Sequence, residues 1–285
     1  MDLFRPRLFE DSPAAAGRQR ARGEVRAAFA RAGARTEATQ VFETGGLRLR
    51  FPRAGDECEA VVVNTGGGMA GGDRARIDLA AAPGARVFVT TQAAEKIYRA
   101  DGAACRIETR LVVEAGGALC WAPQETLLYE GARLERRLEA DVAADGSLLL
   151  IEAAVFGRLA HGETRVAASL LDRWRVRRAG RLVFAEALRL ENAAADLDRP
   201  AVGRGARAIA ALLYLAPDAP NRLAELREAL SGVAVASDGD LDAGASAFDG
   251  ALVARAVARA PEALRATVEA ALRALGGRGR PRVWT

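Results

Sequence analysis

Histidine and cysteine, from which many catalytic and metal sites are built, are scarce in this chain. His161 is the only histidine among 285 residues. Any Ser-His-Asp or Cys-His arrangement would have to include it, and neither a GxSxG motif nor the context of a catalytic cysteine occurs. The three cysteines, Cys58, Cys105 and Cys120, lie in strand-like sequence without CxxC spacing. We expect them to be buried free thiols, and we expect no high-affinity metal site.

Long apolar runs, aromatic residues and an excess of one charge are also missing. No apolar segment reaches about 18 residues, which argues against a membrane span. Aromatic residues make up 5% of the chain, and 41 basic residues are interleaved with 37 acidic ones. No basic stripe with stacking aromatics therefore indicates nucleic-acid binding. The first residues contain arginines and acidic residues but no apolar core of a secretory signal. We expect a cytoplasmic protein in which residues 1–22 form a mobile tail.

Lysine is represented by a single residue, Lys96, so that 41 basic residues less one lysine leave 40 arginines. A compact ammonium in a chain that otherwise uses arginine favours a specific role for this position. Retention by chance on a solvated loop is the alternative interpretation.

What the chain does contain, from residue 35 to about 190, is alternation of apolar and polar residues. The segment RARIDLA alternates Ala75, Ile77 and Leu79 with charged residues, and CRIETRLVV behaves in the same way. Turn signals at 45–46, 82–84, 114–117 and 144–146 separate these segments. The pattern predicts a mainly β fold, either a meander or a solenoid, although no strict repeat is present.

Helical periodicity is concentrated near the C-terminus, where helices are predicted near 219–231 and 261–276. Pro261 suits the first turn of the second helix, and Gly276 suits its C-cap. Both helices are expected to pack on the β structure within a single domain over residues 23–285.

The glycine-rich segment NTGGGMAGGD, residues 64–73, superficially matches the GxGxxG motif of dinucleotide-binding folds. That site needs a helix directly after the glycines, because its free N–H groups hold the pyrophosphate, whereas the alternating segment after Asp73 predicts a strand. A nucleotide-dependent enzyme therefore remains the second hypothesis. Glycine can also allow a positive φ or a close backbone approach, and Asp73 would then lie at a tight bend or cap a plain turn. The glycines concerned are Gly66, Gly67, Gly68, Gly71 and Gly72.

Five segments in unbroken order resemble the urease accessory protein UreD family, also called UreH. They are NTGGGMAGGDR, TTQAAEKIYR (90–99), WAPQETLLYEGA (121–132), IEAAVFGRLAHGE (151–163) and PRVW (281–284). One departure is that the family often has proline just before the glycines, where this chain has Asn64 and Thr65. The resemblance implies a stacked, flattened, β-helix-like pair of sheets with two α-helices in the C-terminal half.

The resemblance also implies a function that is not enzymatic. Proteins of this family act as a scaffold that binds apo-urease, the accessory protein UreF and the GTPase UreG, and help to deliver Ni²⁺ to urease through an internal polar passage. No tightly bound cofactor is expected, and Ni²⁺ would be in transit, since carboxylate, carbonyl and water ligands exchange readily.

Acidic residues in or beside the matching segments are the predicted lining of such a passage, and neighbouring polar residues are predicted to orient them. A buried polar network without a passage, in a purely structural adaptor, is the alternative. The predicted lining residues are Asp73, Glu125, Glu152 and Glu163, and the predicted supporting residues are Thr91, Lys96, Tyr98, Arg99, Gln124 and Arg158.

Overall fold

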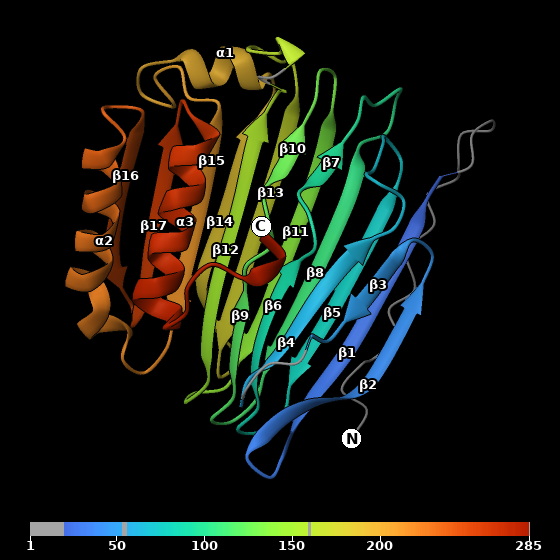
Figure 1. Ribbon diagram of the computed structural model, residues 1–285, viewed down its shortest axis with the longest axis vertical. Coiled ribbons are helices and arrows are strands. Elements are labelled where there is room, and N and C mark those ends of the chain that lie inside the picture. The colour runs from blue at the N-terminus through green and yellow to red at the C-terminus, as the bar shows by residue number, and fades with distance from the viewer. Residues whose placement is uncertain (1–19, 53–55, 159–160, 285) are drawn as a thin grey trace.

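The computed structural model describes residues 20–52, 56–158 and 161–284, and the strands in these ranges form two stacked sheets (Figure 1). Sheet A contains seven strands in the order β14-β13-β11-β8-β5-β1-β2. Its strands are β1 (Arg22–Ala32), β2 (Arg35–Thr44), β5 (Arg74–Ala81), β8 (Cys105–Val113), β11 (Arg133–Val142), β13 (Ser169–Arg178) and β14 (Arg181–Leu190).

Sheet B contains ten strands, of which eight follow the order β16-β17-β15-β12-β9-β6-β4-β3, while β10 pairs with β12 and β7. Its strands are β3 (Leu47–Arg50), β4 (Cys58–Asn64), β6 (Arg86–Thr91), β7 (Glu95–Ile97), β9 (Ala118–Trp121), β10 (Thr126–Leu128), β12 (Ser147–Phe156), β15 (Ala208–Leu215), β16 (Leu241–Phe248) and β17 (Ala251–Ala258).

The chain alternates between the two sheets through its central part. In sheet B, β4 and β12 are followed directly by β5 and β13 of sheet A, whereas β6 and β9 are followed by β8 and β11 of sheet A after the short strands β7 and β10. Neighbouring strands of this series are parallel within each sheet. Each pair of strands therefore forms one flattened turn, and successive turns stack side by side. The mainly β, solenoid-like prediction is confirmed.

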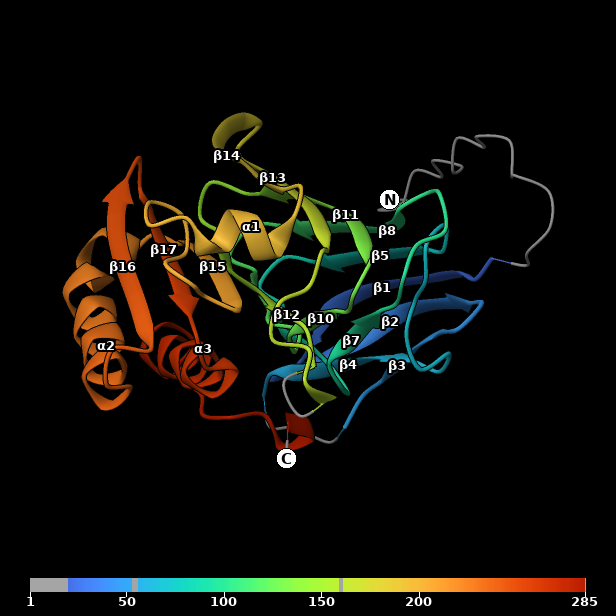
Figure 2. The same cartoon turned by 90° about the horizontal axis from the view of Figure 1, so that it is seen from above.

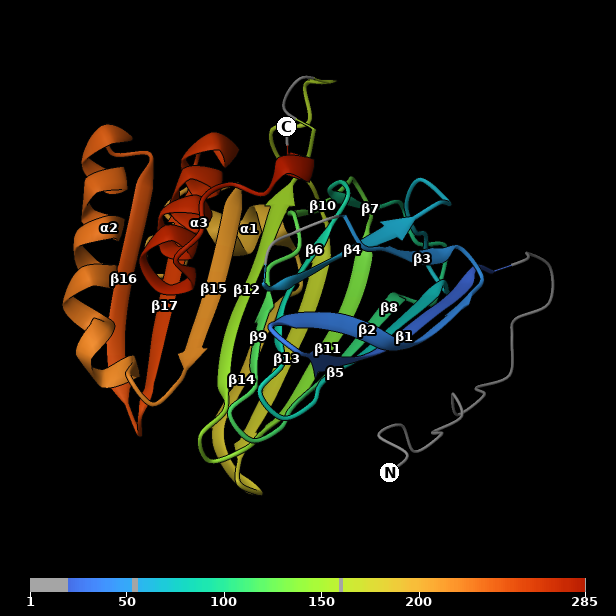
Figure 3. The same ribbon diagram turned by 60° about the horizontal axis from the view of Figure 1, so that its bottom comes forward.

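Helices α2 and α3 form a third layer outside sheet B, whereas the buried residues of the short helix α1, Ala193 and Leu197, pack into the core between the sheets (Figure 2). The strands β15, β17 and β16 extend sheet B beyond the edge of sheet A, and α2 and α3 cover this extension (Figure 3). The helical elements are α1 (Ala193–Asp198), a 3₁₀ turn η2 (Ala219–Arg222), α2 (Leu223–Ala236), α3 (Pro261–Gly276) and a 3₁₀ turn η3 (Arg282–Trp284). Among the described residues, none of the helices has the length and apolarity that crossing a membrane requires.

Two hydrophobic cores follow from this layering, and β12 contributes to both. Leu148 and Leu150 point into the core between the sheets, whereas Leu149 and Ile151 point into the core between sheet B and the helices. Because successive side chains of a strand point to opposite faces, a strand covered on both sides must be apolar on both, as LLLIEAAVF largely is.

Several expectations need correction. Arg76 and Asp78, which alternate with the apolar residues of β5, are buried too, and each is paired with charged neighbours on sheet A. The C-cap of α3 is Gly277, with φ of 61°, rather than Gly276. The first predicted helix extends to Ala236, and the short helix α1 was not expected. Most of the predicted N-terminal tail, residues 1–19, lies outside the described residues.

The glycine loop between β4 and β5 is followed by a strand, as predicted, so the helix that a dinucleotide site requires is absent there. Two of its glycines are needed for close packing. A Cβ atom at Gly68, where φ is 141°, would lie 2.5 Å from the Tyr98 ring and 2.9 Å from the Lys96 carbonyl oxygen. A Cβ atom at Gly71 would lie 2.5 Å from the Ala100 Cβ. The glycines therefore allow the backbone of this loop to pack closely against residues 96–100.

Replacing Gly71 by alanine is predicted to lower the free energy of unfolding by about 1–3 kcal/mol, because the added methyl group overlaps Ala100. The matched control is Gly232→Ala in α2, where nothing lies within 4 Å of the added Cβ. That substitution is expected to raise the free energy of unfolding by about 0.5–1 kcal/mol. Urea denaturation followed by circular dichroism distinguishes the two, and equal stability of Gly71→Ala and the unsubstituted protein would contradict the packing account.

Candidate functional site

The segments singled out from the sequence gather on the side of sheet B where its parallel strands end. The parallel strands β4, β6, β9 and β12 all end on this side, so the loops that follow them are neighbours. Backbone hydrogen bonds join these loops directly. The Met69 amide donates to the Lys96 carbonyl at 2.7 Å, the Ala100 amide to the Gly131 carbonyl at 3.0 Å, and the Gly157 amide to the Leu128 carbonyl at 2.8 Å.

A cavity of about 140 Å³ runs from this side of sheet B into the space between the sheets. Its outer end is lined by exposed residues of two loops, among them Gly67 and Gln92, and its inner end by buried Arg136 and Glu152. Further polar lining residues are Asn64, Thr91, Glu95, Lys96, Thr109, Gln124 and Thr126. The lining is mixed, since apolar side chains, among them Val62, Ile77 and Trp121, lie beside these polar ones, whereas the surrounding inter-sheet core is apolar.

At the inner end, three charged side chains form a buried group that we call the inner cluster: Arg136 on β11, Glu152 on β12 and Asp172 on β13. Their side chains are 5%, 4% and 8% exposed. The Arg136 guanidinium donates to both carboxylates, and the Trp121 indole N–H donates to Glu152 at 2.7 Å. Arg136 and Asp172 come from sheet A and Glu152 from sheet B, so the inner cluster bridges the two sheets.

Burial and charge together set the protonation of this cluster. Burial raises the pKa of Glu152, and it does so against the opposing effect of Arg136. Burial by itself would lower the pKa of Arg136, but the charges of Asp172 and Glu152 outweigh it and hold the pKa above its ordinary value. The guanidinium therefore stays charged and offsets one of the two carboxylates.

Three buried polar atoms in or beside the inner cluster have no hydrogen-bond partner in the protein. The Nε of Arg136, the Oδ1 of Asp172 and the Oγ1 of Thr109 are buried and have no hydrogen-bond partner. Unpaired buried polar atoms cost free energy, and a polar cavity is where water or an ion can satisfy them. The inner end of the cavity thus has the chemistry of a hydrated site.

The outer end of the cavity has a carboxylate of its own, that of Glu95. Glu95 accepts hydrogen bonds from the Asn64 side chain at 3.0 and 3.1 Å. Burial raises the pKa of Glu95, opposed by the Asn64 hydrogen bond and by Lys96. Asn64 therefore fixes the orientation of an acidic group beside the cavity.

The cavity includes some of the predicted site residues and not others. Glu152, Thr91, Lys96, Gln124, Gly67 and Gly68 line it, whereas Asp73, Glu125, Glu163, Tyr98, Arg99 and Arg158 are not among the lining residues. Asp73 accepts hydrogen bonds from the Ala70 and Ala21 amides at 2.8 and 2.9 Å, as a turn cap does. Glu163 pairs with Arg158, whose guanidinium lies 4.6 Å from the Tyr129 ring centroid.

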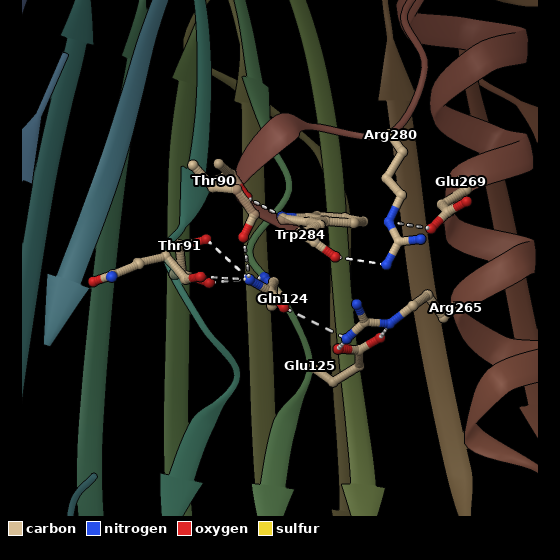
Figure 4. A network of polar contacts seen from close by, with 10 residues as sticks. Thr90, Thr91, Gln124, Glu125, Arg265, Glu269, Arg280 and Trp284 are labelled. Atoms are coloured by element: carbon tan, nitrogen blue, oxygen red, sulfur yellow. Dashed lines mark hydrogen bonds and ion pairs between the residues drawn. The ribbon is translucent and has the colours of Figure 1, made fainter. Parts of the chain in front are cut away.

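Glu125 belongs to a separate network that anchors the C-terminal segment, residues 277–284, on the helix side of sheet B (Figure 4). The Arg265 side chain of α3 donates to Glu125 at 2.9 Å. The Trp284 indole N–H donates to the Thr90 hydroxyl at 2.7 Å, and Trp284 is 3% exposed. The Gln124 amide, which lines the cavity, reaches the Val283 carbonyl at 3.5 Å. The PRVW segment therefore packs against the wall of the cavity.

Comparison with known proteins shows the family of this chain. The family model for the UreD urease accessory protein matches residues 21–285. The chain belongs to the UreD family. It is 48% identical over 268 residues to the urease accessory protein UreD of Xanthobacter autotrophicus, covering 94% of this chain and 91% of that protein. It is 45% identical to UreD of Azorhizobium caulinodans, with 94% and 97% covered.

In this UreD family member, two of the three charges of the inner cluster, Arg136 and Asp172, were not predicted, although the sequence carries a signal for them. In β11 the inward series Leu134, Arg136, Leu138 is apolar except at Arg136, and in β13 Asp172 interrupts Leu170 and Trp174 in the same way. A charged residue at one of the alternate strand positions that are otherwise apolar indicates a buried charge that needs a partner. Glu152 was found because it lies in a matching segment.

Thiolates and imidazole do not contribute to this site. None of the residues that line the cavity is a cysteine or histidine. Among the residues that the structure describes, no three or more His, Cys, Asp and Glu side chains are grouped closely enough to hold a metal ion. Cys58, Cys105 and Cys120 are free, and the first two are buried while Cys120 is half-buried.

The cysteines are predicted to be unreactive in the folded protein. Burial raises the pKa of the Cys58 thiol to about 11 and also raises those of Cys105 and Cys120. At pH 8 only about one Cys58 in a thousand would be a thiolate, the reactive form. We expect iodoacetamide to label these residues at least about a hundredfold more slowly in the folded than in the urea-unfolded chain. Mass spectrometry of labelled peptides measures this, and equal rates would contradict the burial.

Proposed function

We propose that the protein is a scaffold of the urease activation complex and helps to deliver Ni²⁺ to apo-urease, and that the ion passes through the cavity between the sheets. Its proposed partners are apo-urease, UreF and UreG, and it catalyses no reaction itself. Membership of a urease accessory family supports the general role in urease maturation. The passage is inferred from this chain's own side chains.

The observation that carries the proposal is a cavity whose lining includes charged and polar side chains within an otherwise apolar inter-sheet core. Burying charged groups between two sheets costs stability, so a role beyond folding explains why Arg136, Glu152 and Asp172 lie there. The lining supplies carboxylate, amide and hydroxyl oxygens. These ligands hold Ni²⁺ less tightly than imidazole or thiolate and exchange more readily, which suits transit rather than storage.

The test is urease maturation in cells in which Glu152→Gln replaces the unsubstituted protein. This change keeps the size of the side chain and removes its charge, and we expect the nickel content of purified urease to fall by about tenfold. The matched control is Glu163→Gln, since Glu163 does not line the cavity. That variant should leave the nickel content unchanged.

Two further readouts make the result interpretable. Co-purification of the Glu152→Gln variant with urease and with UreF should match that of the unsubstituted protein, which shows that the scaffold is intact. Normal nickel content in urease matured with a folded Glu152→Gln variant would overturn the proposed passage.

A further inference from the structure

The inner cluster contains a fixed positive charge at the point where a cation passage would need negative charge. Arg136 lines the cavity and binds both carboxylates, whereas Asp172 does not line the cavity and is reached through Arg136. The Nε of Arg136 and the Oδ1 of Asp172 remain unpartnered, although both side chains are more than nine-tenths buried. The guanidinium is therefore not placed to satisfy every polar atom around it.

Charge arithmetic shows what the guanidinium does to an arriving ion. When both carboxyl groups are ionised, two carboxylates and one guanidinium give the inner cluster a net charge of −1, from −2 and +1. A divalent cation is attracted to this cluster but cannot be fully balanced by it, because the total becomes +1. Without Arg136 the carboxylates would carry −2, and a divalent cation would be neutralised in a low-dielectric site, where opposite charges interact strongly.

We propose that Arg136 is a positioning residue that prevents the inner cluster from retaining the metal ion. It holds Glu152 and Asp172 apart as an internal counter-ion, so that the cavity attracts a hydrated divalent cation without becoming a tight binding site. This inference rests on the proposed function, since it concerns the same cavity and the same ion. Arg136 then determines whether the cavity lets the metal ion pass or binds it tightly.

The experiment varies the charge of the inner cluster in steps. The unsubstituted protein has −1, Asp172→Asn has 0, Arg136→Met has −2, and the double variant Arg136→Met with Asp172→Asn returns to −1. Each full-length variant is purified for equilibrium dialysis against Ni²⁺ alone, and each is also used to mature urease in cells. The control is Arg137→Met, because Arg137 is exposed on the outer face of the same strand.

We expect Arg136→Met to bind one Ni²⁺ at least about tenfold more tightly than the unsubstituted protein and to deliver less nickel to urease. Asp172→Asn should deliver less nickel without binding it more tightly, and the double variant should recover at least half of normal delivery. Arg137→Met should match the unsubstituted protein in both measurements.

A double variant that delivers no more nickel than Asp172→Asn would overturn the inference, as would Arg136→Met that folds and binds Ni²⁺ no more tightly. If Arg136→Met does not fold, the comparison of Asp172→Asn with the double variant still decides, because the double variant has the original net charge. The two proposals can fail separately. A loss of delivery in Glu152→Gln without charge rescue in the double variant retains the passage and rejects the role of Arg136.

Discussion

Replacing Arg136 by alanine should lower the free energy of unfolding at pH 7.5 by about 3–5 kcal/mol, one of the two largest effects we expect from a single substitution. The change leaves Glu152 and Asp172 buried without their common partner. Thermal or urea denaturation measures the loss. Arg137→Ala is the control, since its exposed ion pair with Glu139 should contribute less than about 1 kcal/mol.

The loss should depend on pH, and the direction follows from Glu152. Burial already raises its pKa, and removal of Arg136 removes an opposing effect, so the pKa in the folded variant rises further. A carboxyl group with a raised pKa destabilises the folded state where it is ionised, that is, above the folded pKa, and this destabilisation disappears as pH falls through that value. The stability difference between Arg136→Ala and the unsubstituted protein should therefore shrink from pH 8 to pH 5. A difference that stays constant or widens would contradict the assignment of Glu152 as a buried ionised partner.

Replacing Trp284 by alanine should also lower the free energy of unfolding by about 3–5 kcal/mol, although this residue lies one position from the end of the chain. The ring is buried in the core between sheet B and the helices, and its N–H donates to Thr90. Removal would free the C-terminal segment and withdraw the Val283 carbonyl from Gln124 at the cavity wall.

Trp284→Phe is the matched variant, because it keeps an aromatic ring and loses the hydrogen bond to Thr90. We expect it to cost less than half as much as Trp284→Ala. Limited proteolysis should cut the segment 277–284 in the alanine variant and not in the phenylalanine variant. Resistance of the alanine variant to both denaturant and protease would show that the segment does not depend on this anchor.

The overall architecture could be predicted because its signals are local. Alternation over 35–190 gives strands, the turns at 114–117 and 144–146 separate them, and the stripes of leucine and alanine give α2 and α3. The stacking of strands in two sheets was implied by the family resemblance and not by periodicity, since the sequence has no strict repeat that corresponds to successive turns of the solenoid. The helix C-cap was placed one residue early because Gly276 and Gly277 are adjacent, and only the backbone φ distinguishes them.

The site was predictable only in part, for a physical reason. The matching segments were expected to contribute to one passage, and the loops in them do contact one another, because they follow parallel strands that end on the same side of sheet B. Which carboxylate faces the cavity depends on strand register and on the opposite sheet. Glu125 and Glu152 lie in similar segments, yet one pairs with Arg265 outside sheet B and the other with Arg136 between the sheets.

The measurement that tests the central claim most directly is the nickel content of urease matured with a blocked cavity. Ala75 of β5 lines the cavity and is buried, so Ala75→Phe places a ring in the passage without altering its charges. Ala185→Phe is the control, because Ala185 of β14 is exposed. If Ni²⁺ passes between the sheets, the folded Ala75→Phe protein will co-purify with urease as usual while urease nickel falls by about tenfold or more. Full nickel content in that urease would show that the ion takes another route.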